Sequence, residues 1–340
     1  MSESRMRWLP FELHTHTFHS DGKQSLLELA EGAKELGLAG VALTDHNTMT
    51  GLADRERVVE QTGVEVIRGL EWTTFFGHMV TLGIQDYVDW RNLSPFHIHR
   101  GIEGVHRQGG LVGVAHPFRV GSPMCTGCFW EFEVSDWAQV DYIEVWSGLF
   151  PSIRRNNERA FAFWTELLNQ GHRISATCGR DWHVAEPPAE PIAATFLAIP
   201  AEETMPGPLA GAALAALGRG AAAISMGPLP LISIRSDSSA PLAGIGEVIE
   251  TQAAAPTVQL ELSVDFSVRE GLWELQKPEV ELRITSNLGT LMSCELSQAL
   301  PKVVCPLKTQ GLAWIRGELY GVFHGARTMI GFTNPIYFEH

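Results

Sequence analysis

The stretch from Trp8 to Gly22, WLPFELHTHTFHSDG, decides the fold because it joins an apolar strand to a group of potential metal ligands. Residues 8–13 form a predicted β-strand, and His14 and His16 stand at its end. Side chains alternate along an extended strand, so the two imidazoles lie on one face. A single His-x-His pair is common by chance, and the interpretation therefore depends on how the other strands end.

Four further predicted strands end in side chains of the same kind. The residues at these ends are Asp45 with His46, Glu71, His116, and Asp181 with His183. In a parallel α/β barrel the carboxyl ends of all strands meet at one face, which carries the chemistry. Asp21, His46 and Glu71 follow one another at intervals of 25 residues, about one βα unit, which places them on neighbouring strands. Because histidine and carboxylate side chains bind divalent transition metals, the repetition predicts a polynuclear metal site.

Helical patterns separate these strands. Ser25 is placed to cap a helix over residues 26–36, which Gly37 ends. Two further helices are predicted, from Pro95 to about Gln108 and from Asn156 to Asn169. Strands that alternate with helices indicate βαβ units, and therefore an α/β protein with a parallel sheet or barrel.

The pattern changes after about Ser233, where apolar and polar residues alternate. The alternating segments are 258–266, 280–284 and parts of 312–320. Such alternation is typical of antiparallel sheets with one face in water. We predict an α/β domain that carries the metal site over residues 1–232 and a small C-terminal β-sandwich-like domain over 233–340, with a loop at 237–241 near the boundary. If the protein forms a homo-oligomer, we expect the interface to lie on the C-terminal domain.

Composition narrows the class of protein. The chain has 340 residues, of which 45% are hydrophobic and 19% charged, as in ordinary globular proteins. A formal net charge of −14 argues against a nucleic-acid polymer as a partner, since phosphate backbones require clustered Lys and Arg. We find neither a run of 18 apolar residues nor the apolar core of a signal peptide, and expect no membrane association.

The number and spacing of the cysteines indicate the cellular compartment. Five cysteines, an odd number and widely spaced, suit a reducing compartment better than a disulfide framework. We therefore expect a cytoplasmic protein. Its expected partner is a small-molecule substrate. Cys125 and Cys128 form a lone CxxC, for which a simple thiol pair is a better interpretation than a zinc or redox site.

Five motifs resemble, in order, those of the PHP (polymerase and histidinol phosphatase) superfamily. They are His14-Thr-His16-Thr-x-x-Ser20-Asp21-Gly22, Thr44-Asp45-His46 to Gly51, Gly69-Leu-Glu71, Ala115-His116-Pro117 and Gly179-Arg180-Asp181-Trp-His183. The resemblance covers about residues 8–200 and implies a distorted (β/α)7 barrel. The sequence departs from the family pattern where Arg180 replaces a serine and where His19 adds an imidazole to the first motif, and either change could alter substrate choice.

A weaker similarity continues towards the end of the chain. Gly218-Arg-Gly with Met226-Gly-Pro228, and Trp314-Ile-Arg316 with Thr333-Asn-Pro-Ile-Tyr337, resemble the closing region of the carbaryl-hydrolase-like (CehA/McbA) branch of the superfamily. This likeness keeps open a hydrolase of carbamate, ester or amide bonds. A non-catalytic PHP module is a further alternative, although the intact ligand set argues against it.

The resemblance also implies a distribution of ligands over three metal ions. The first ion would be held by His14, His16, Glu71 and Asp181, the second by Glu71, His78 and His116, and the third by Asp21, His46 and His183. Asp45 would support catalysis by accepting a hydrogen bond from an imidazole and orienting it. We expect two to three divalent ions, Mn²⁺, Fe²⁺ or Zn²⁺.

Charge favours a phosphorylated substrate. A metal-bridging hydroxide is a strong nucleophile, because coordination lowers the pKa of water from about 15.7 to about 7. Three divalent ions, three carboxylates and one hydroxide leave two positive charges, which a phosphomonoester dianion neutralises. With two ions the net charge is zero, and a neutral substrate fits. We therefore predict a phosphoesterase acting on a small phosphorylated compound, for which a nucleotide is one candidate.

Two arginines are candidates for gripping the phosphate. Arg119 follows the His116 motif and Arg180 precedes Asp181, and guanidinium groups suit phosphate oxygens. For Arg180, a structural salt bridge with a neighbour is an equally good interpretation.

Overall fold

The computed structural model describes residues 6–121, 129–205, 207–236, 241–250 and 256–339. The predicted thiol pair of Cys125 and Cys128 lies outside these residues, as do residues 237–240 of the predicted boundary loop. Within the described residues the chain forms a mixed α/β structure with one large and one small sheet.

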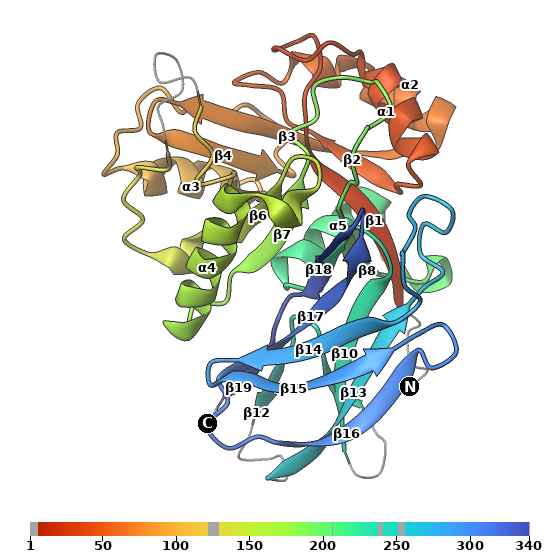
Figure 1. Ribbon diagram of the computed structural model, residues 1–340. Coiled ribbons are helices and arrows are strands. Elements are labelled where there is room, and N and C mark those ends of the chain that lie inside the picture. The colour runs from red at the N-terminus through yellow and green to blue at the C-terminus, as the bar shows by residue number, and fades with distance from the viewer. Residues whose placement is uncertain (1–5, 122–128, 206, 237–240, 251–255, 340) are drawn as a thin grey trace.

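Nine strands of the described residues form the part of the large sheet that carries the N-terminal two thirds of the chain (Figure 1). They are β1 (Met6–Thr15), β2 (Gly40–Leu43), β3 (Glu65–Thr74), β4 (Gly77–Leu82), β5 (Leu111–Val114), β6 (Tyr142–Ser147), β7 (Ser175–Gly179), β8 (Ala194–Pro200) and β9 (Ala222–Ser225). β1 to β7 lie side by side in chain order, and β8 and β9 continue the sheet from β1. Most residues of these strands are buried, in agreement with the largely apolar sequences of β2, β5, β8 and β9.

The predicted run of parallel strands is interrupted at β4. β1, β2 and β3 are parallel, as are β5, β6 and β7, but β4 is antiparallel to both of its neighbours. Only Phe75 and Phe76 connect β3 to β4. Two residues can close a hairpin, whereas a parallel crossover needs a dozen or more. The β3–β4 connection is therefore a hairpin and not a βα unit.

The barrel prediction is not confirmed, because the sheet does not close. β7 has no ladder with β1, and only Trp182, beyond the end of β7, pairs with the end of β1. Side chains occupy this edge of β7 instead. The hydroxyl of Thr195 accepts from the N–H of Cys178 at 3.0 Å, and Asn334 Oδ1 accepts from the N–H of Ala176 at 2.7 Å. These bonds satisfy backbone groups that barrel closure would otherwise use.

In the described part of the chain, five α-helices accompany the strands. They are α1 (Leu26–Glu35), α2 (Arg55–Thr62), α3 (Ile98–His106), α4 (Arg155–Asn169) and α5 (Leu209–Gly218). Short 3-10 helices lie at Thr50–Asp54, Trp137–Gln139, Pro151–Ile153 and Glu202–Thr204. The predicted cap is confirmed, since Ser25 and Glu28 form a reciprocal capping box at the start of α1. α3 begins three residues later than predicted because His97 N–H bonds to Ser94 C=O in a turn.

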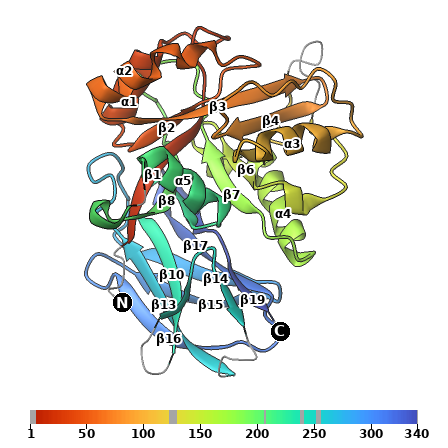
Figure 2. The same ribbon diagram turned by 180° about the vertical axis from the view of Figure 1, so that it is seen from behind.

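The helices cover the outer surface of this part of the sheet. α4 packs beside β6 and β7, and its fully buried Trp164 donates to the carbonyl of Ile174 at 2.8 Å (Figure 1). α5 lies across β8 on the side seen in Figure 2. Among the described residues no helix combines the length and apolar character needed to cross a lipid bilayer.

The C-terminal part of the chain consists of strands. They are β10 (Leu229–Arg235), β11 (Pro241–Gly244), β12 (Val248–Glu250), β13 (Thr257–Asp265), β14 (Val280–Ser286), β15 (Gly289–Leu296), β16 (Lys302–Lys308), β17 (Trp314–Phe323), β18 (Ala326–Thr333) and β19 (Ile336–Glu339). β10, β11, β13 and β16 form the small sheet, while β18 pairs with β9 and so joins the other strands to the large sheet. The boundary proposed between residues 232 and 233 falls inside β10, and the division into two domains stays a prediction.

We expect Asn334→Ala to lower the free energy of unfolding by about 3 kcal/mol. Asn334 is fully buried, and its Nδ2 also donates to the carbonyls of Ala176 and Ala222 at 3.0 and 3.1 Å. Alanine would remove the acceptor of the Ala176 N–H and a donor to the Ala176 carbonyl, and each buried group left unpaired costs about 1–3 kcal/mol. The carbonyl of Ala222 would still accept from the backbone N–H of residue 334 at 3.0 Å. Chemical denaturation measures the loss. Asn287→Ala is the control, because Asn287 bonds Gly311 and Ala313 at an exposed site; equal losses would contradict the assignment.

Candidate metal centre

The predicted metal ligands gather at one edge of the sheet, where several strands end. His14 lies at the end of β1, His46 and His116 lie just beyond β2 and β5, and Asp181 and His183 follow β7. In the described part of the chain all the predicted ligands fall into three groups, each with ligand atoms within 4.8 Å of one another. The structure therefore brings together residues that are as much as 169 positions apart in the sequence (14 to 183).

The first group consists of His14, His16, Glu71 and Asp181. Asp181 Oδ1 lies 2.9 Å from His16 Nε2 and 3.4 Å from His14 Nε2. Glu71 Oε2 lies 3.5 and 3.3 Å from the same two nitrogens. Two imidazoles and two carboxylates thus point at a common position.

Glu71 also belongs to the second group, with His78 and His116. Its other oxygen, Oε1, lies 2.9 Å from His78 Nδ1 and 3.3 Å from His116 Nε2. Each oxygen of this fully buried carboxylate therefore faces a different group. A carboxylate placed in this way would be able to supply one oxygen to an ion in each group.

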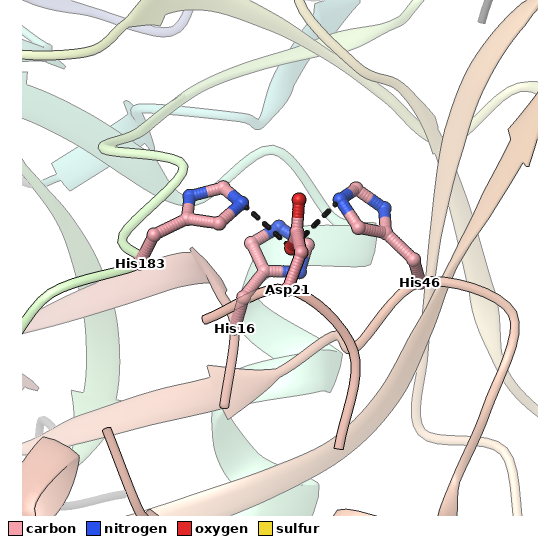
Figure 3. Close-up of side chains that lie close together, drawn as sticks. All are labelled: His16, Asp21, His46 and His183. Carbon is pink, nitrogen blue, oxygen red and sulfur yellow. Dashed lines mark ion pairs between the residues drawn. The ribbon is translucent and has the colours of Figure 1, made fainter. Parts of the chain in front are cut away.

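The third group is shown in Figure 3 and comprises His16, Asp21, His46 and His183. Asp21 Oδ1 lies 3.3 Å from His46 Nε2 and 3.1 Å from His183 Nε2. The ring of His16 stacks against both His46 and His183, with a centroid separation of 4.2 Å in each case, and the rings of His46 and His183 lie 6.0 Å apart. His16, predicted only for the first group, thus adjoins the third as well.

Several of these ligand atoms are buried without a hydrogen-bond partner. They are His14 Nε2, both ring nitrogens of His16, Glu71 Oε2 and Asp181 Oδ1. Buried polar atoms are nearly always satisfied, so a convergence of unsatisfied ones indicates a ligand for them. Imidazole and carboxylate donors without thiolates suit Mn²⁺, Fe²⁺ or Zn²⁺. The residues present therefore fit divalent metal ions.

The pKa values of Glu71, Asp181 and His14 depend on one another's charges. Burial by itself raises the pKa of Glu71, but His14 and His78 hold that pKa well below its usual value. The pKa of Asp181 likewise lies well below its usual value, because His14 and His16 outweigh the effect of burial. Burial lowers the pKa of His14, yet Glu71 and the other carboxylates raise it well above the ordinary range. Ionised carboxylates here attract positive charge, which protons or metal ions can supply.

Two buried carboxylates that the sequence did not predict support the site. Glu144 in β6 is 3% exposed, and its Oε2 lies 2.6 Å from His14 Nδ1, which fixes that imidazole. Glu12 Oε1 accepts from the backbone N–H groups of His14 at 3.1 Å and Arg180 at 2.9 Å, and burial raises the pKa of Glu12 to about 7. The signal was an acidic residue inside an otherwise apolar strand, in FEL and in YIEVW.

The role predicted for Asp45 is corrected by the structure. Asp45 accepts from the N–H of Thr17 at 2.7 Å, from its hydroxyl at 2.7 Å and from Ser20 Oγ at 2.6 Å, and it has no imidazole partner among the described residues. Neighbouring side chains leave the end of β2 in opposite directions, so His46 faces the centre and Asp45 faces the 17–20 loop. Asp45 therefore holds the loop that carries Asp21.

The two predicted phosphate-binding arginines lie in different places. Arg119 Nη1 contacts Asp181 Oδ2, and its side chain lines the cavity above the metal groups. Arg180 stacks on the indole of Trp182, with its guanidinium carbon 3.9 Å from the ring centroid, and lines a neighbouring cavity instead. His19 bonds Thr50 at 2.9 Å and lies outside the three metal groups.

The cavity above the metal groups has a volume of about 380 Å³, enough for a small molecule. Its floor is formed by ligand side chains, and Phe129 and Trp130 contribute to its wall. A larger cavity of about 690 Å³ lies between the start of β1 and the small sheet. None of the three metal groups of the described residues lies there, so the smaller cavity is the candidate active site.

Comparison with known proteins agrees with this geometry. The PHP domain family matches residues 12–105. The uncharacterized protein MJ1587 of Methanocaldococcus jannaschii is 32% identical over 125 residues, which are 34% of this chain and 69% of that protein. A phosphoribosyl 1,2-cyclic phosphate 1,2-diphosphodiesterase of Eggerthella lenta is 30% identical over 81 residues, 22% of this chain and 31% of that enzyme.

One solved structure is similar along almost the whole chain. It is a two-domain protein from Bacteroides vulgatus that contains a predicted PHP-like metal-dependent phosphoesterase. The likeness covers 97% of this chain and 95% of that one, with a TM-score of 0.55 and 14% identity, and it supports the fold alone. Taken with the family match and the MJ1587 relative, the ligand motifs at the strand ends lead to one conclusion: this chain belongs to the PHP domain family.

Proposed function

We propose that this protein is a metal-dependent phosphoesterase that hydrolyses a small phosphorylated compound. The observation that carries the proposal is the convergence of three ligand groups, linked by Glu71 and His16, on the floor of one cavity. A purely structural role does not account for several unsatisfied buried ligand atoms pointing at one another. The name of the Eggerthella lenta relative, a diphosphodiesterase, is consistent with phosphoester chemistry.

The charge of the site favours an anionic substrate. Asp21, Glu71, Asp181 and Glu144 are the carboxylates in or against the ligand groups. Three divalent ions would exceed these four carboxylates and one hydroxide by one charge, and Arg119 at the cavity wall brings the excess to two positive charges. A phosphate ester neutralises such a site, whereas a neutral carbamate leaves it charged. Phosphoester hydrolysis therefore fits better than the carbamate, ester or amide alternative.

Residues of the chain divide the catalytic tasks. Metal ions, when bound, supply the Lewis acidity that activates water and neutralises phosphoryl oxygens. Glu144 fixes the ring of His14, so that Nε2 is directed at the ligand groups. Arg119 lies over Asp181 at the edge of the cavity, where its free N–H groups can donate to a phosphoryl oxygen.

The number and the identity of the metal ions are also part of the proposal. We propose three ions and choose Mn²⁺, Fe²⁺ or Zn²⁺ from the donor types. From the sequence we also propose a nucleotide substrate and membership of the carbaryl-hydrolase-like branch. We propose as well a cytoplasmic location and oligomerisation through residues 233–340.

We expect Glu71→Gln to reduce turnover more than 100-fold and to lower the metal content. The amide keeps the shape of the side chain but removes the charge shared by two ligand groups. Loss of a supporting residue typically costs about 10–100-fold, and a direct ligand should cost more. Elemental analysis and p-nitrophenyl phosphate turnover are the measurements. Glu60→Gln, at an exposed site on α2, is the control, and near-native metal and activity in Glu71→Gln would remove Glu71 from the site.

Chelation by EDTA should abolish activity, and Mn²⁺, Fe²⁺ or Zn²⁺ should restore it. The donor set lacks the thiolates that hold a metal against chelators most tightly. Activity is followed before chelation, after removal of the chelator and after each ion is added, with a sample incubated without chelator as the control. Full activity in protein shown to be free of metal would overturn the proposed function.

Arg119→Ala should lower kcat/KM for p-nitrophenyl phosphate by about 100-fold, since one preorganised donor to a transition-state oxygen contributes about 3 kcal/mol. A naphthyl carbamate should lose less, because it presents no extra anionic oxygens. Metal content should be retained. Arg107→Ala, an exposed arginine after α3, serves as the control. Equal, small losses on both substrates would mean that Arg119 is structural.

A further inference from the structure

A second cavity of about 430 Å³ adjoins the cavity of the metal centre. Arg119 and Val120 line both, so the two spaces are neighbours. The second cavity is also lined by Arg154 and Arg180, which brings three guanidinium groups to one small space. In a chain with a net charge of −14, such a concentration of positive charge requires an explanation.

The guanidinium of Arg180 is held in place but not satisfied. It stacks on Trp182, and its Nε and Nη1 are buried without a hydrogen-bond partner. Glu12 is the nearby negative charge, yet its Oε1 accepts from the backbone N–H of Arg180. In the described part of the chain the guanidinium forms no ion pair. Buried donors of this kind call for an acceptor.

Ser147 at the end of β6 is a second unsatisfied group in the same cavity. The residue is 3% exposed, and its Oγ has no hydrogen-bond partner. A serine hydroxyl both donates and accepts, so it can complete the coordination of an oxyanion. Because Ser147 lies on a different element from Arg180, the two observations are independent.

Arg154 closes the cavity from the start of α4. Its Nε donates to the carbonyl of Leu149 at 2.6 Å, which leaves the terminal amino groups for another partner. The guanidinium carbon lies 3.5 Å from where a Cβ of Gly148 would stand, so the Arg154 side chain packs beside the turn at Gly148. No carboxylate among the described residues pairs with Arg154. α4 begins at Arg155, and the positive end of its dipole adds to the attraction for anions.

We propose that this second cavity, defined by Arg119, Arg154, Arg180 and Ser147, binds a second anionic group of the substrate. That group is an oxyanion, either a carboxylate or a phosphate. It is held in the second cavity while the reacting phosphoryl group lies at the metal centre. The substrate is therefore a phosphorylated compound with two separate anionic groups. The inference rests on the proposed function for the reacting group, while anion binding in the second cavity stands independently of it.

Anion binding to the full-length, metal-loaded protein tests the proposal. Isothermal titrations use inorganic phosphate and, separately, benzoate as probes. We expect Arg154→Ala to abolish one binding event, or to weaken it by about tenfold or more, for at least one probe. Arg154→Lys should restore part of the affinity, and Ser147→Ala should weaken it by less. Arg155→Ala is the matched control, because this exposed neighbour does not line the cavity and should bind as the parent protein does.

The outcomes separate the two proposals. A loss confined to phosphate or to benzoate identifies the chemistry of the second group. Equal binding of both probes by Arg154→Ala and the parent protein, or an equal loss in Arg155→Ala, would overturn the inference. Turnover of p-nitrophenyl phosphate is measured alongside. Binding that depends on Arg154 without any turnover would uphold the second cavity and reject the phosphoesterase, whereas turnover without such binding would do the reverse.

Discussion

The fully buried carboxylate of Glu71 is the constraint on which the rest of the centre depends. An ionised carboxylate removed from water is tolerated only when positive charge surrounds it. Five imidazoles, those of His14, His16, His46, His78 and His116, meet its two oxygens. Because these histidines come from different strands, the need to compensate one charge ties four segments of the chain to the same point. Removing the charge would release all of them together.

The open edge of β7 has a comparable role in placing Asp181. In a closed barrel this strand would form a ladder with β1, but Thr195 and Asn334 satisfy part of its edge instead. The chain beyond β7 is then free to turn, and Asp181 takes a left-handed backbone with φ of 54°. Gly179 permits the close approach, since a Cβ there would lie 2.6 Å from His14 Cβ. The C-terminal strands thus contribute to the site without supplying a ligand.

The predicted ligands lie close together in the structure because their positions follow from local rules. A polar residue at the end of a buried strand is placed by the alternation of side chains, and the strands were recognisable from their apolar runs. The orientation of β4 depends on a two-residue connection, which the search for βα units passed over. Glu12 and Glu144 were missed because their partners lie far away in the sequence, and Asp45 was assigned an imidazole that only a three-dimensional structure could exclude.

The hairpin of β3 and β4 has a consequence for how the centre can vary. Thr73 pairs with His78 and Glu71 with Val80, so Glu71 and His78 are diagonal neighbours on one face of the ladder. Their separation is fixed by backbone pairing and not by the packing of two independent loops. Loops elsewhere around the cavity can lengthen or shorten and leave the ligands in place. The connection at Phe75 and Phe76 cannot change its length in this way. One added residue that shifts the register would turn His78 to the opposite face of the ladder.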